Sequence, residues 1–167
     1  MRYVMGALLA LAIVLVQVSS VQQFRLLGVS PNLVLVVLVA WVVVRSFDDA
    51  LPMVAICGLL TGLIDLQTPG LVMLALLIAT AAAGALRELH IIHSETVLLL
   101  LCVLAGSILY EGTLFAATLV AGGVFDPVAG FGDAVLPAAV VNVIIALPIY
   151  LLMRLGRAQK PRGAYSW

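Results

Sequence analysis

The sequence predicts an all-α, polytopic membrane protein with six transmembrane helices, and three observations lead to this prediction. The chain has 167 residues, of which 65% are hydrophobic and 10% charged, and its mean hydropathy is +1.28. A soluble domain has roughly 45–50% apolar and about 25% charged residues, so lipid must surround most of this chain. The apolar residues form long runs without the alternation of barrel strands, which leaves helices as the spanning structure. Because a spanning helix needs about 20 apolar residues, the length allows about six spans and no separate soluble domain.

The first predicted span covers residues 3–21, where an apolar run follows Arg2. Tyr3 lies near the start of this run, as interfacial aromatic residues do. A cleaved signal peptide is the alternative, because Val18-Ser19-Ser20 offers small residues for cleavage. Cleavage would leave an odd number of spans, so we expect the segment to stay as a helix.

The other five spans are separated by clusters of Gly, Pro, Asp and Ser, which end helices and form turns. The predicted spans cover about residues 31–44, 51–66, 71–86, 96–121 and 134–153. The breaks between them are VSPN at 29–32, SFDD at 46–49, TPG at 68–70, the polar stretch around 88–95, and residues 122–133. The span at 31–44 is short, so it needs residues 26–29 as well or must tilt little. Tyr150 marks the interfacial end of the last span.

Basic residues predict the orientation of these spans. With six spans both termini share one side of the membrane, and seven of the eight Lys and Arg residues fall on that side. They are Arg2, Arg45, Arg87, Arg154, Arg157, Lys160 and Arg162. Only Arg25 falls on the other side, so the positive-inside rule predicts that both termini are cytoplasmic. The polar, basic tail at 154–167 is interpreted as a solvated end that holds this topology, or alternatively as a contact for anionic lipid or a cytoplasmic partner.

Four polar side chains interrupt the apolar spans at similar depth. At a rise of 1.5 Å per residue, Gln17 and Asp65 lie about 21 Å, and Glu111 about 22 Å, from the cytoplasmic start of their spans. Asn142 enters from the other side and lies about 18 Å from the inner face of a roughly 30 Å core. The sequence therefore predicts a polar layer in the outer half of the membrane. It leaves three interpretations open: hydrogen bonds between helices, a functional cavity open to the outside, or positions exposed to water.

Two glycines share a helix face with one of these polar residues. Gly58 and Gly62 form a GxxxG motif, and Asp65 continues the same face. Small residues there allow close approach of another helix, either from the same chain or from a partner. The helix macrodipole disfavours a carboxylate in the last turn, so Asp65 must meet water, find a donor or be protonated.

The sequence contains no motif for catalysis or for a cofactor. The phosphate-binding, dinucleotide-binding and HExxH zinc motifs are absent, and the zero net charge gives no sign of nucleic-acid binding. His90 and His93 lie between Glu88 and Glu95, a stretch that we interpret as a wet loop, with a metal site as the alternative. The two cysteines lie inside apolar runs and are expected to be packing thiols. We therefore expect a protein that is not an enzyme and holds no metal.

Three segments together resemble the MreD family of rod shape-determining proteins. Ser30-Pro31-Asn32 before an apolar run with Trp41 resembles the start of that family's second span. Gly58, Gly62, Asp65, Pro69 and Gly70 resemble its third span and the following turn. Its last span is resembled by Val141-Asn142, Pro148 and Leu151-Leu152-Met153-Arg154. Residues 96–133 and the first span match in hydropathy alone, so the resemblance gives Glu111 no support.

The resemblance implies a non-enzymatic subunit of the bacterial elongation machinery in the inner membrane. Members of this family associate with the single-span protein MreC and, through it, with MreB, RodA and a penicillin-binding transpeptidase. They help to set rod shape and lateral peptidoglycan synthesis. The fold is also implied to be similar to the S-components of energy-coupling-factor vitamin transporters. The alternative function is therefore a small-molecule binding or transport subunit, with Asp65, Glu111 and Asn142 lining an outward-facing cavity.

Overall fold

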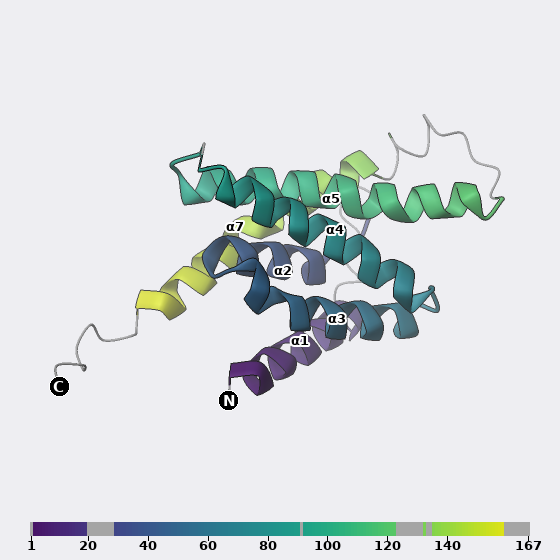
Figure 1. Ribbon diagram of the computed structural model, residues 1–167, viewed down its shortest axis with the longest axis horizontal. Helices are drawn as coiled ribbons and strands as arrows, with labels where there is room; N and C mark the ends of the chain where they lie inside the picture. The colour runs from purple at the N-terminus through teal and green to yellow at the C-terminus, as the bar shows by residue number, and fades with distance from the viewer. Residues whose placement is uncertain (1, 20–28, 91, 123–131, 133–134, 159–167) are drawn as a thin grey trace.

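The computed structural model describes residues 2–19, 29–90, 92–122, 132 and 135–158 and is built from helices (Figure 1). The helices are α1 (Arg2–Ser19), α2 (Leu33–Val44), α3 (Phe47–Ile64), α4 (Pro69–Glu88), α5 (Glu95–Val120) and α7 (Leu136–Ala158). Within the described residues, this confirms the predicted all-α class.

Four of these helices are long and apolar enough to cross a membrane. They are α3, α4, α5 and the part of α7 from Leu136 to Arg154. The apolar parts of α1 and α2 are shorter, at Leu8–Ser19 and Leu33–Val44. The four long helices indicate a membrane-embedded protein, while six spans stay a prediction.

The helices run back and forth along the long axis of the molecule, with α2 at the centre (Figure 1). The start of α1 and the end of α7 lie at one end of the bundle, which we name the terminal end. The opposite end carries the connection from α3 to α4, and we name it the turn end. Helix α2 contacts α1, α3, α4, α5 and α7. Its surroundings are therefore protein on all sides.

Local capping explains where the helices differ from the predicted spans. Helix α3 begins at Phe47, four residues before the predicted span, because the Ser46 hydroxyl accepts a hydrogen bond from the Asp49 N–H at 3.3 Å. Helix α4 begins at Pro69, since proline suits the first helical position, where no N–H is needed. Helix α7 continues through 154–158, the first residues of the predicted tail, and residues 159–167 lie outside the described part of the chain.

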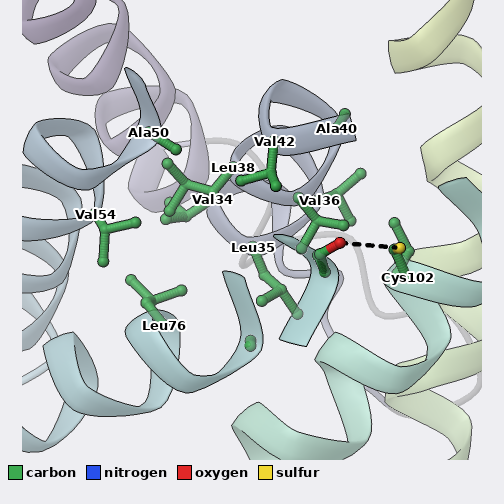
Figure 2. Close-up of a cluster of buried hydrophobic side chains, with 14 of the residues drawn as sticks. Val34, Leu35, Val36, Leu38, Ala40, Val42, Ala50, Val54, Leu76 and Cys102 are labelled. Atoms are coloured by element: carbon green, nitrogen blue, oxygen red, sulfur yellow. Dashed lines mark hydrogen bonds between the residues drawn. The ribbon is translucent and has the colours of Figure 1, made fainter. Parts of the chain in front are cut away.

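The apolar sequence of α2 reflects its central position. Nine of its twelve residues are buried, and a helix that is hydrophobic all round belongs in a protein interior. Figure 2 shows Leu35 and Val36 of this helix in a cluster with Val54 of α3, Leu76 of α4 and Cys102 of α5. Twelve residues extend only about 18 Å, well short of a roughly 30 Å hydrocarbon core. Helix α2 therefore starts inside the bundle and needs polar partners there.

The GxxxG motif brings α3 directly against α4. A Cβ atom added at Gly58 would lie 2.6 Å from the Cα of Met73, and one added at Gly62 would lie 2.4 Å from the Cα of Pro69. Both distances are far below van der Waals contact, so a side chain at either position would collide with backbone. The small-residue face thus packs against a helix of the same chain.

Polar contacts join the helices at the terminal end. The Tyr150 hydroxyl donates to Glu95 Oε2 at 2.9 Å, which links the end of α7 to the start of α5. Arg87 Nη1 donates to the carbonyl of Val42 at 3.1 Å, which links α4 to the end of α2. The guanidinium of Arg45 lies 4.5 Å from the ring centroid of Trp41, a cation–π distance.

Candidate functional site

The start of α2 poses a hydrogen-bonding problem that its own residues solve only in part. The first N–H groups of any helix have no partner within the helix, and a bundle surrounded by lipid offers little water to replace one. Asn32 is the N-cap, and its Oδ1 accepts from the Leu35 N–H at 3.0 Å. The other hydrogen-bond partners for the backbone at the start of α2 must come from neighbouring helices.

Gln17 of α1 supplies two of these bonds with a single side chain. Its Oε1 accepts from the Leu33 N–H at 2.7 Å, and its Nε2 donates to the Pro31 carbonyl at 3.0 Å. The amide of Gln17 therefore pairs with the backbone on both sides of Asn32, much as a neighbouring strand would. This fixes the end of α1 against the start of α2.

Asn142 of α7 completes the arrangement from the opposite side. Its Oδ1 accepts from the Asn32 N–H at 2.8 Å, and its Nδ2 donates to the Ser107 hydroxyl of α5 at 3.0 Å. Both Asn142 and Ser107 are buried, with exposed fractions of 1% and 0%. A buried amide with good partners adds specificity, whereas the same amide without them would carry a desolvation cost.

We name Gln17, Asn32, Ser107 and Asn142 the polar cap. It joins α1, α2, α5 and α7 at one level of the bundle, on the side of the turn end. Two of the four residues predicted to form a polar layer, Gln17 and Asn142, therefore bind the same short segment of backbone. Both side chains therefore form hydrogen bonds between helices, which is the first of the three interpretations of the polar layer.

The two predicted carboxylates lie at the edge of the polar cap. Asp65 is exposed and caps the end of α3, where its N–H donates to the Thr61 carbonyl at 2.9 Å. Glu111 is half-buried in α5, next to the buried Tyr110. The Tyr110 side chain lies near both of these carboxyl groups and near the side chain of Asn32. Tyr110 is thus near both the two carboxyl groups and the polar cap.

Sequence reasoning did not single out three residues of this region as site residues. Asn32 carried a recognisable signal, because an asparagine just before an apolar run is a helix-start signature. Ser107 and Tyr110 carried none, since single Ser and Tyr residues inside an apolar helix are common. Their importance follows from which helices meet, and that information is not local.

The remaining candidates from the sequence are the two histidines and the two cysteines. Within the described residues, no group of three or more His, Cys, Asp or Glu side chains is placed to hold a metal ion. His90 and His93 are exposed, and Nδ1 of His90 donates to the Glu88 carbonyl at 2.6 Å. Cys57 and Cys102 are buried free thiols, each near a backbone carbonyl of a neighbouring helix.

Chemically, the polar cap is a set of amides and a hydroxyl whose bonds go to backbone and to one another. Such groups fix the position of helices, and none of them is a strong acid, base or nucleophile at neutral pH. The carboxyl groups of Asp65 and Glu111 lie near these amides, towards the turn end. No family model, curated protein or solved structure matches the chain.

Proposed function

We propose that the chain is a non-enzymatic membrane subunit of the bacterial rod, or elongation, complex. In this proposal it binds the transmembrane helix and adjoining segment of an MreC protein and, through it, works with MreB, RodA and a penicillin-binding transpeptidase. It would lie in the inner membrane with six spans in an S-component-like bundle and both termini in the cytoplasm. Its role would be to regulate cell shape and lateral peptidoglycan synthesis.

One observation carries the proposal. Two segments that resemble the MreD family, Ser30-Pro31-Asn32 and Val141-Asn142, are separated by more than a hundred residues, yet Asn32 and Asn142 are hydrogen-bonded to each other. The third segment is also used within the fold, because Gly62 packs on Pro69 of its own turn. The residues behind the resemblance therefore act together to hold one arrangement of helices. A shared arrangement is what a shared partner surface requires.

The proposed mechanism needs rigidity rather than chemistry. A central helix held by α1, α5 and α7 gives the outer faces of the bundle a fixed geometry. A partner helix can recognise such a face by shape, since helices in lipid associate through packing and through hydrogen bonds. The subunit would then bias how the wall-synthesis enzymes are arranged, without reacting with a substrate.

A second candidate is a small-molecule binding or transport subunit. The observation in its favour is that Asp65 and Glu111 both lie near Tyr110, next to the polar cap. Against it, the Asn142 amide is already bonded to Asn32 and Ser107. A ligand that used Asn142 would have to displace those bonds.

Affinity purification of the tagged chain in mild detergent, followed by mass spectrometry, separates the two candidates. We expect an MreC-like protein to be retained, and to be retained equally by Asp65→Ala and Glu111→Ala variants, because neither carboxylate lies in the packed core. Recovery of a vitamin-like compound together with an ATPase pair, lost in the same two variants, would contradict the proposal and support the transport subunit. The expression and extraction of each variant are compared with those of the wild-type chain prepared in the same way.

A further inference from the structure

A polar pocket lies at the terminal end of the bundle, away from the polar cap. It is formed where α3 begins and α4 ends, and its volume is about 320 Å³. Its lining comes from the start of α3 and from the end of α4 with the residues that follow: Ser46, Phe47, Asp48, Gly84, Arg87, Glu88 and His90. None of the polar-cap residues lines this pocket.

The length of α4 places this pocket at the level of lipid headgroups. The helix has 20 residues and extends about 30 Å, which equals the thickness of a typical hydrocarbon core. If α4 crosses the membrane, its last residue, Glu88, therefore lies at the boundary between acyl chains and headgroups. A polar pocket at that depth is open to headgroups of the surrounding lipid.

One part of the pocket lining has groups that can accept hydrogen bonds from a cationic group such as an ammonium. Asp48 and Glu88 are exposed carboxylates. His90 donates from Nδ1 to the Glu88 carbonyl, so Nε2 of the neutral ring is left as an acceptor. The carbonyl end of α4 adds negative potential at the same place. The ring of Phe47 offers an aromatic face, which also attracts a cation.

Another part of the lining has groups that can donate hydrogen bonds to an anion such as a phosphate. Arg87 uses one N–H for the Val42 carbonyl, and the guanidinium has further N–H groups to donate. The Ser46 Oγ accepts from the Asp49 N–H, which leaves the hydroxyl proton to donate. The pocket thus combines groups for a small cation with groups for a phosphate.

We propose that this pocket binds the phosphoethanolamine headgroup of a membrane lipid. A primary ammonium donates three hydrogen bonds, which suits Asp48, Glu88 and His90, and the adjoining phosphate suits Arg87 and Ser46. A phosphocholine headgroup has the same charges, but its quaternary ammonium has no N–H to donate. A phosphoglycerol headgroup has the phosphate and no cation. The pocket therefore distinguishes phosphatidylethanolamine from both.

Native mass spectrometry of the purified full-length chain tests this proposal. The protein is mixed with equal amounts of phosphatidylethanolamine, phosphatidylcholine and phosphatidylglycerol of the same acyl composition. We expect the phosphatidylethanolamine adduct to exceed each of the others about tenfold, the ratio that one charge-assisted hydrogen bond supports. The double variant D48N/E88Q is expected to lose this preference. Asp49→Asn is the matched control, because Asp49 neighbours Asp48 but does not line the pocket.

Three results would overturn the proposal. The first is equal binding of phosphatidylethanolamine and phosphatidylcholine by the wild-type chain, which decides the question even if the variants do not fold. The second is a preference that survives in D48N/E88Q at an unchanged melting temperature. The third is displacement of the lipid by water-soluble O-phosphoethanolamine at equal concentration, which would assign the pocket to a soluble compound instead.

Discussion

Replacing Gly62 with leucine is expected to abolish the folded protein in detergent extracts of membranes. The new Cβ would lie 2.4 Å from the Cα of Pro69, and backbone cannot rotate away as a flexible side chain can. Added methylenes in a packed core cost about 1–3 kcal/mol, and a collision with backbone is at the upper end or beyond. Helices α3 and α4 would have to separate. Size-exclusion chromatography of a fluorescent fusion measures the loss of the monodisperse peak.

A matched pair of alanine variants separates this collision from a general effect of losing a helical glycine. Gly62→Ala is expected to lower the melting temperature clearly, whereas Gly112→Ala in α5 should leave it unchanged or raise it slightly. A Cβ added at Gly112 meets nothing within 4 Å, and alanine is the better helix former there. Equal melting temperatures for the two variants would show that the close packing of α3 on α4 is not needed.

Replacing Asn142 with leucine is expected to destabilise the chain by about 1–3 kcal/mol, the cost of leaving buried polar groups without partners. Leucine has the same branched shape and the same number of side-chain heavy atoms as asparagine, with methyl groups in place of the amide oxygen and nitrogen. The Asn32 N–H and the Ser107 hydroxyl both lose the partner that they have in the wild-type chain. Thermal unfolding in detergent measures the effect. Val140→Leu serves as the control, since Val140 is exposed on the same helix, and substitutions at such positions usually change stability by less than about 0.5 kcal/mol.

A double-mutant cycle assigns part of this effect to a single bond. Ser107→Ala is expected to be destabilising in the wild-type background and close to neutral in the N142L background, because the bond is already lost there. The coupling should fall between about 0.6 and 1.7 kcal/mol, the average and the maximum for hydrogen bonds between helices in membranes. Additive effects of the two substitutions would mean that the Asn142–Ser107 bond contributes nothing to stability.

Local sequence patterns predicted the helices but not their partners. Apolar runs and turn residues located each helix to within a few residues, because lipid admits few other backbone structures. The sequence shows that the second apolar segment, at 31–44, is short, but no local pattern shows why it is short. Helix α2 is enclosed by the other helices and does not have to match the membrane thickness. Enclosure depends on the packing of the whole chain.

The same limit applies to the polar residues. Counting residues along each predicted span puts Gln17 and Asn142 at similar depth, but depth alone does not say which way a side chain faces. Their common target, the backbone at 31–33, is defined only once α1 and α7 both pack against α2. Ser107 could not be identified, because its partner lies on another helix, 35 residues along the chain.

The proposed role in the elongation complex is tested most directly by depleting the chain in its source organism while imaging new wall synthesis with a fluorescent D-amino acid. If the chain is an MreD-like subunit, rods should round up, and labelling of the lateral wall should disappear before growth stops. Expression of the wild-type chain should restore both, and the G62L variant should restore neither. Cells that keep their rod shape and lateral labelling while uptake of a small molecule falls would contradict the role in cell shape.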